Sequence, residues 1–173
     1  MKKLTPLALA FVALAGACGE QTETARARGE GMQEAGWSNV AELAGVVQAA
    51  AVVRVVGQRE TAIGSTGYTV SAARVTEVLK GPWDVGDEVD LRQMGLRNDG
   101  PVFDQPMMDP GSDYVVFARD VQLPNDRPVP FFHVFGLYGL DGDSWRHLAH
   151  ESPMADADRT ITLNEIRSAI ASA

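Results

Sequence analysis

The sequence predicts a chain of mainly β structure with flanking helices, an α+β architecture in which a small β-barrel or meander lies between an N-terminal and a C-terminal helix. Two observations carry this prediction. Five or six short apolar runs, rich in β-branched residues, are separated by turns that contain glycine or proline. A helix-capping pattern precedes the first run and another follows the last. The length of 173 residues and the 45% hydrophobic content suffice for a single globular domain, which we place at residues 38–173.

The N-terminal helix is expected to begin after Asn39. Asn39 and Glu42 have the spacing of a capping box, in which a side chain accepts a hydrogen bond from the first helical turn. Val40, Leu43 and Val47 then recur on one helical face. This helix is therefore expected to pack that face against the sheet.

The first two strands are expected to form a hairpin. Residues 51–56 are almost entirely apolar and β-branched, and we expect the strand to end at Gly57. After a glycine-rich turn, residues 68–79 form a longer strand whose apolar alternation changes phase partway along. A β-bulge near Ala72 and Ala73 reconciles the two phases, because a bulge inserts one extra residue and reverses the faces.

Three further strands follow. Residues 89–92 alternate apolar with charged side chains, as in a half-buried strand with Arg92 on the solvent side. Residues 114–118 are apolar on both faces, which is typical of a covered central strand. Residues 131–140 form another strand, and residues 141–143 are expected to make the hairpin turn after it.

The C-terminal helix has the most complete local pattern. Thr162 and Glu165 form a second capping box, and Ile161 and Ile166 occupy the positions of a hydrophobic staple around it. We expect this helix to bury Leu163, Ile166 and Ile170.

The charge and cysteine content exclude several classes of protein. The 23 acidic residues outnumber the 15 basic ones, for a net charge of −8. Nucleic-acid binding is excluded on this basis, because it requires clustered Lys and Arg to neutralise phosphates. The single cysteine excludes an internal disulfide and any cysteine-rich metal cluster.

Residues 1–17 have the organisation of a secretory signal peptide. Lys2 and Lys3 form a positive n-region, and residues 7–18 form an uncharged run of apolar or small residues. That run is shorter than the roughly 20 residues that a transmembrane helix needs. The chain is therefore expected to be exported, with cleavage before Cys18.

The end of this segment resembles the lipobox of bacterial lipoproteins, in which cleavage precedes a cysteine that becomes acylated. Cys18 is the only cysteine, and Ala15 stands where that motif usually has leucine. The resemblance implies a diacylglyceryl anchor on Cys18, with acyl chains such as palmitate. Residues 15–17 also form an A-x-A cleavage site. Ordinary secretion with a free Cys18 thiol is therefore the alternative.

Residues 18–37 are expected to be a flexible tether, because they alternate charged with small residues and lack apolar periodicity. Removal of Lys2 and Lys3 would leave 13 basic and 23 acidic residues, for a net charge of −10. An aspartate after the cysteine is the usual signal for inner-membrane retention, and Gly19 takes that place here. We therefore expect the outer membrane in a diderm host, and otherwise the outer face of the cell membrane.

The domain resembles a secreted bacterial family of unknown function, similar in pattern to the OB-like fold of netrin-type and metalloproteinase-inhibitor domains. The resemblance spans residues 39–170 and depends on the segments VVRVVG, YTVSAARVTEVLKG, GDEVDLRQMG, GSDYVVFARD and TLNEIRSAI. It implies a small OB-like β-barrel. The inhibitors act through a free, disulfide-linked N-terminal cysteine. Because Cys18 has no partner thiol and is expected to be acylated, that activity is not carried over.

Two arrangements of residues bear on catalysis or metal binding. Ser144 lies beside Asp143 and near His147, but it falls in a predicted hairpin turn where serine is common, and no G-x-S-x-G motif is present. His133, His147 and His150 form the alternative site, that of a metal-binding protein or metal-dependent enzyme. In a strand, His147 and His150 would face opposite sides.

Methionine and aspartate clusters support two weaker hypotheses. A soft copper site is one interpretation of three methionines, although methionine more often fills irregular space in a core. Weak calcium binding is one interpretation of four loop aspartates, although their spacing does not match a calcium loop. These residues are Met94, Met107 and Met108, and Asp99, Asp104, Asp109 and Asp113.

The function predicted from these observations is that of an envelope-anchored lipoprotein whose domain is a non-enzymatic binding module for a protein or a ligand. An envelope protein is the candidate partner. No catalytic, cofactor or metal residue is assigned. The expected contact surface is the loop of residues 98–113, with Phe103, Met107 and Met108 exposed. Lys80, at the end of a predicted strand, is assigned no role.

Overall fold

The structure is a computed structural model that describes residues 37–97, 106–120, 132–148, 154 and 156–173. It confirms the predicted fold class, because one seven-stranded sheet dominates and short helices lie at its ends. The strands are β1 (Ala49–Ile63), β2 (Thr66–Lys80), β3 (Glu88–Met94), β4 (Asp113–Asp120), β5 (Phe132–Asp141), β6 (Ser144–His147) and β7 (Thr160–Ile161). The helices are α1 (Val40–Val46), α2 (Asp156–Arg159) and α3 (Leu163–Ala171).

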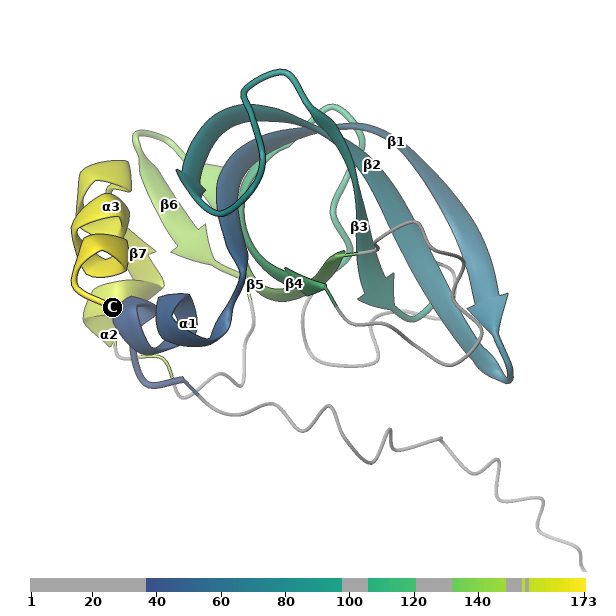
Figure 1. Cartoon of the computed structure of the whole chain (residues 1–173), viewed down its shortest axis with the longest axis horizontal. Coiled ribbons are helices and arrows are strands. Elements are labelled where there is room, and N and C mark those ends of the chain that lie inside the picture. Colours follow the sequence, from purple (N-terminus) through teal and green to yellow (C-terminus); the bar gives the residue numbers. More distant parts are fainter. Residues whose placement is uncertain (1–36, 98–105, 121–131, 149–153, 155) are drawn as a thin grey trace, which may run out of the picture.

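The sheet curves so far that β3, its first strand, reaches β5 (Figure 1). The strand order is β3-β2-β1-β4-β5-β6-β7, with antiparallel pairing along the sheet. A short parallel pairing joins Leu91 to Phe132 and Arg92 to His133. Strands β3, β2, β1, β4 and β5 therefore lie in this order around a ring. The order is compatible with the OB-like fold that the family resemblance implies.

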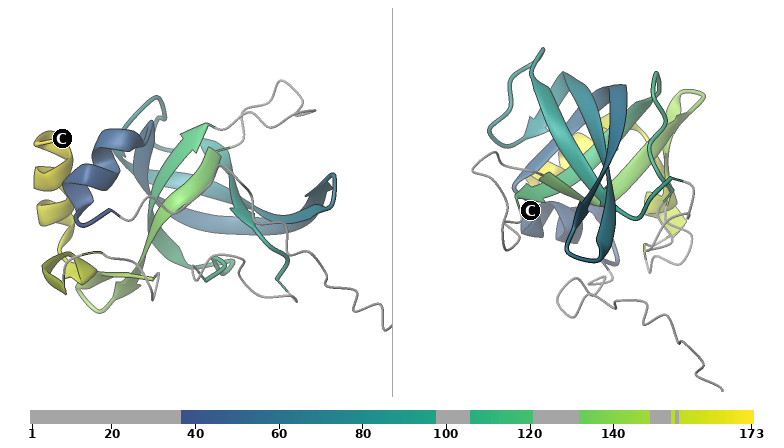
Figure 2. Two further views of the ribbon diagram at one scale, coloured as in Figure 1. Left: turned by 90° about the horizontal axis from the view of Figure 1, so that it is seen from below. Right: turned by 90° about the vertical axis from the view of Figure 1, so that its right-hand side faces the viewer.

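Two hydrophobic cores lie on opposite faces of this curved sheet. Alternate residues of β1, such as Val53 and Val55, join Leu91 and Val116 in the core that the ring encloses. Val52 and the other residues of opposite phase pack with the helices, which lie outside the ring (Figures 1 and 2). The prediction that residues 114–118 form a strand covered on both faces is confirmed, since all five are buried.

The β1–β2 hairpin is longer than predicted and projects away from the helices (Figure 2). The prediction that Gly57 ends the first strand is wrong, because β1 continues to Ile63. The irregularity expected near Ala72 and Ala73 is present, but the extra residue is Val56 on β1, which the pairing passes over. The Val56 side chain is 49% exposed, and Arg54, two residues before it, is exposed as well.

Helix α1 begins as predicted, with Asn39 Oδ1 accepting a hydrogen bond from Glu42 N at 2.9 Å. The capping box is only half formed, because the Glu42 carboxylate accepts hydrogen bonds from Ser38 instead. These bonds lower the pKa of Glu42. At the other end of the helix, Lys80 Nζ donates to the Ala44 carbonyl at 2.6 Å. Lys80 therefore does have a role, since it satisfies a free carbonyl at the helix C-terminus.

Helix α3 has the complete capping box between Thr162 and Glu165 that the sequence predicts. Ile161 and Ile166 are both buried, as expected for a staple. Trp37 packs edge-on against Phe135 with ring centroids 6.0 Å apart. Trp37, the last residue of the predicted tether, therefore packs on the domain.

The predicted signal peptide, Cys18 and residues 19–36 of the predicted tether lie outside the described residues. Within the described part, none of the helices combines the length and the apolar character needed to cross a membrane.

Candidate functional site

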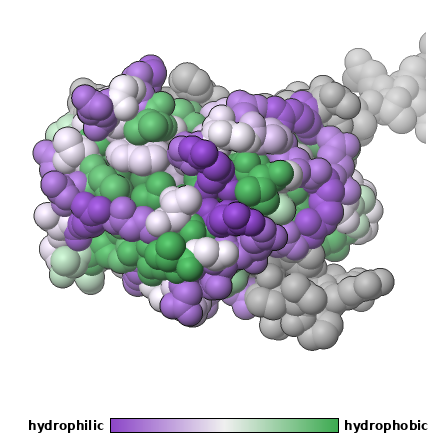
Figure 3. Space-filling model, turned by 90° about the horizontal axis from the view of Figure 1, so that it is seen from above, coloured by the Kyte–Doolittle hydropathy of each residue, from purple (hydrophilic) through white to green (hydrophobic). Residues whose placement is uncertain are grey.

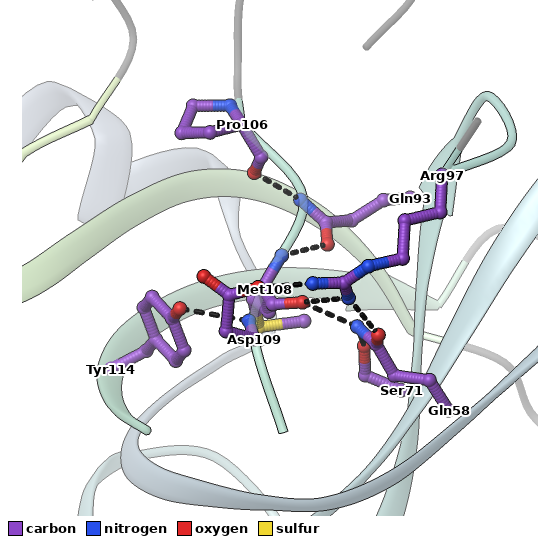
Figure 4. Close-up of polar contacts among 8 residues, drawn as sticks. All are labelled: Gln58, Ser71, Gln93, Arg97, Pro106, Met108, Asp109 and Tyr114. Atoms are coloured by element: carbon purple, nitrogen blue, oxygen red, sulfur yellow. Dashed lines mark hydrogen bonds and ion pairs between the residues drawn. The ribbon is translucent and has the colours of Figure 1, made fainter. Parts of the chain in front are cut away.

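A short segment, residues 106–109, lies against β1, β3 and β4 near the C-terminal end of β3 (Figure 4). We call this end of the ring of strands, where the segment is bound, the mouth. Met108 is 0% exposed and packs in the enclosed core with Leu91 and Tyr114. The prediction that Met107 and Met108 are exposed is therefore wrong for Met108, and Met107 is half-buried. Methionine as core packing, the alternative to a copper site, is what the structure shows for Met108. Phe103 lies outside the described residues.

The Gln93 side chain on β3 binds the main chain of this segment at two points. Its Nε2 donates to the Pro106 carbonyl at 3.0 Å, and its Oε1 accepts from Met108 N at 3.0 Å. Gln93 is itself only 4% exposed. A primary amide that donates and accepts in this way replaces the peptide group that a neighbouring strand would supply.

Side chains from other elements complete the arrangement. Gln58 on β1 donates from Nε2 to the Met108 carbonyl and, at 2.9 Å, to Ser71 Oγ on β2. Arg97 donates to the same carbonyl at 3.3 Å. The Tyr114 hydroxyl on β4 accepts from Asp109 N at 2.8 Å. Four main-chain groups of the segment, from the Pro106 carbonyl to the Asp109 amide, are thus bonded to side chains of the surrounding strands.

The outer side of the segment carries charge. Arg97 forms an ion pair with Asp109, and these side chains are 44% and 61% exposed. Just beyond the segment, Arg54 makes two hydrogen bonds to Asp113 at 2.8 and 2.5 Å, and this contact lowers the pKa of Asp113. Both aspartates therefore pair with arginine and are not grouped as calcium ligands. Asp99 and Asp104 lie outside the described residues.

A second buried polar group lies on the other face of β3. Arg92 is 1% exposed, and its guanidinium contacts His133 Nε2 at 3.3 Å and lies 5.3 Å from the centre of the Tyr68 ring. The expectation that Arg92 lies on a solvent-exposed face is therefore wrong. The pairing of β3 with β5 places Arg92 beside His133, and a residue-by-residue alternation pattern does not reveal such a contact.

Two of the three histidines of the predicted metal site lie in the part of the chain that the structure describes. His133 packs against Tyr68, whereas the His147 ring packs against Tyr138 with centroids 4.9 Å apart. His150 lies outside the described residues, and among those that are described no three His, Cys, Asp or Glu side chains group as metal ligands. The hypothesis that all three histidines bind one metal ion therefore stays a prediction.

Burial raises the pKa of the Tyr138 hydroxyl, with a smaller effect from Asp158.

The hairpin turn consists of Gly142 and Asp143, and Ser144 is the first residue of β6. The prediction that Ser144 lies in the turn is therefore wrong by one residue. His147 is the last residue of the same strand and has its ring against Tyr138. Ser144 and His147 are three positions apart in the strand, so their side chains leave opposite faces. This arrangement does not form a serine–histidine pair.

The sequence analysis missed Gln58, Gln93 and Tyr114. One of them could have been found from the sequence pattern. Gln93 is a polar residue in phase with Val89 and Leu91, on the apolar face of β3. A buried amide in such a position needs polar partners, which here are main-chain groups of the mouth segment.

No protein-family model matches the chain, and a search of curated proteins found no match. The mouth is therefore the candidate functional site. Its amide, guanidinium and phenol groups are suited to holding a peptide main chain, and its interior accepts an apolar side chain.

Replacement of the buried Met108 should reduce stability more than replacement of the half-buried Met107. Met108→Ala should lower the free energy of unfolding by about 2–5 kcal/mol, because it leaves a cavity in the enclosed core. Met108→Leu should lower it by less than about 1.5 kcal/mol, because volume is kept. Urea denaturation gives these values, with Met107→Ala as the matched control. Equal losses for Met107→Ala and Met108→Ala would contradict the burial of Met108.

Proposed function

We propose that this protein is a lipid-anchored component of the bacterial cell envelope whose OB-like domain is a non-enzymatic binding module for an envelope protein. The observation that carries the binding role is the mouth, where side chains of Gln58, Gln93 and Tyr114 hold an extended main chain. Domains that bind extended peptides at a sheet edge gain affinity from hydrogen bonds to the peptide main chain and specificity from pockets for its side chains. At the mouth, side chains make the bonds to the main chain.

The surface of the domain is consistent with a limited contact area. On the face seen in Figure 3, hydrophobic residues gather in several separate patches that hydrophilic side chains divide. Small separated patches are ordinary on soluble domains, whereas a large continuous one would mark an extensive interface. The face in Figure 3 therefore offers no broad apolar interface, and we place the contact at the mouth.

The anchor is proposed from the segment that ends at Cys18. After cleavage the chain would carry a net charge of −10, so electrostatic attraction cannot hold it on an anionic membrane. Acyl chains can, because each buried CH₂ contributes about 0.8 kcal/mol and two chains together give stable anchoring. The following residues up to Gly36 would then let the domain stand off the bilayer.

Cys18→Ser should release the mature protein into the periplasm or medium, or leave the precursor uncleaved, because the acylated sulfur is lost. Fractionation of cells carrying either form measures the release. Mass spectrometry of the native N-terminal peptide should show a diacylglyceryl group on Cys18. A free, unmodified Cys18 thiol would establish plain secretion and contradict the anchor.

The binding role is tested by photo-crosslinking in the native envelope. A photoreactive residue in place of Pro110, which is exposed beside the mouth, should form an adduct with one envelope protein. The matched control is Val85, which is 68% exposed in the turn between β2 and β3, at the opposite end of these strands. Equal adducts at both positions, or none at either, would contradict a binding site at the mouth.

A further inference from the structure

We infer that the mouth is a binding site for an extended peptide carrying an unbranched apolar residue followed by an acidic one, and that residues 106–109 are its internal occupant. This inference rests on the proposed function and names the ligand class. The partner is thus expected to present a segment with the same chemistry as the one already seated there.

The groups of the mouth bind a main chain. The Gln93 amide bonds both the Pro106 carbonyl and the Met108 amide, and Gln58 and Arg97 both donate to the Met108 carbonyl. None of these contacts involves a side chain of the occupant. The same groups would therefore serve another extended segment in the same place.

The Met108 side chain is fully buried in the enclosed core, and an unbranched thioether adapts to irregular space better than a β-branched chain. The next residue, Asp109, pairs at the surface with Arg97. The enclosed core thus selects a long flexible apolar residue, and Arg97 selects an acidic residue immediately after it.

The segment is separable from the sheet. The ladder between β1 and β4 ends at the pair Arg54 and Asp113, and the last main-chain bonds join Val55 to Gly111 and Ser112. Before that point, the strands bond the segment through side chains, and Arg97 adds a further side-chain contact. One main-chain bond, from Ser112 N to the Asp109 carbonyl at 3.2 Å, joins the segment to the turn that follows it. Pro106, the first residue of the segment, and Pro110, directly after it, have no N–H to add to a ladder.

A resident segment lowers the apparent affinity for an external peptide by the fraction of molecules in which the mouth is open. Any substitution that weakens the resident segment, but not the strands around it, therefore raises that affinity. Met108 and Asp109 belong to the segment, whereas Gln58, Gln93 and Arg97 belong to the site that receives it.

The test uses the full-length chain and a blocked synthetic peptide of residues 106–111, titrated by calorimetry. Met108→Ala should bind the peptide at least about tenfold more tightly than the unaltered chain, because the resident anchor is lost. Asp109→Ala should bind it about two- to fivefold more tightly, because an exposed ion pair contributes little. Asp143→Ala, in the exposed turn after β5, is the matched control and should change nothing.

Peptide variants establish the recognition chemistry. A peptide with serine in place of the residue corresponding to Met108 should lose binding to Met108→Ala by at least about tenfold. Adding Gln93→Leu to Met108→Ala should abolish binding, because two main-chain bonds are lost. Circular dichroism checks that each variant is folded. If Met108→Ala does not fold, Asp109→Ala, a change at the surface, still provides the test.

Three results would overturn the inference. One is the absence of saturable binding to folded variants at about 1 mM peptide. Another is equal affinity for the serine peptide. The third is dimerisation of the variants without peptide, which would make a second copy the occupant. A partner crosslinked at Pro110 alongside any of these results would retain the proposed function while refuting the peptide chemistry.

Discussion

The insertion of Met108 into the enclosed core is the interaction on which the arrangement of the mouth depends. A loop that crosses an apolar interior brings main-chain polar groups with it, and each buried group needs a hydrogen-bond partner. Gln93 meets this need for the Pro106 carbonyl and the Met108 amide, and Gln58 meets it for the Met108 carbonyl. The buried glutamine and the buried methionine therefore require each other. Without the segment, the Gln93 amide would be left facing Leu91 and its apolar neighbours.

The two cores give the sheet different tasks on its two faces. The outer face binds helices α1 and α3, and the Lys80 bond to the end of α1 joins that helix to β2 as well. The absence of a side chain at Gly136 lets Leu43 of α1 approach β5 closely, because a Cβ there would overlap Leu43 Cδ2. The inner face is completed at the mouth by Met108. Both cores contribute to stability, and the binding chemistry that we propose lies at the mouth.

Local patterns in the sequence predicted those features that local physics controls. The caps at Asn39 and Thr162 follow from side-chain hydrogen bonds within one turn, and the covered strand of residues 114–118 follows from its continuous apolar character. Burial of Arg92 and Met108 was not predictable in this way. Each depends on contacts between segments distant in the sequence, namely β3 with β5 and the mouth segment with β1 and β3. The extension of β1 past Gly57 likewise depends on pairing with β2, which overrides the local preference of glycine for turns.

Native-state amide hydrogen exchange tests most directly the claim that residues 106–109 are a separately held occupant of the mouth. The amides of Met108 and Asp109 are bonded to Gln93 and Tyr114. They should share one protection factor, above that of an unstructured chain and below that of the β1–β4 ladder, because the segment opens as a unit while the sheet stays intact. Exchange as fast as in an unstructured chain would show that the side chains do not hold the segment. Exchange as slow as in the ladder would show that the segment opens only with the whole sheet, and would contradict the account.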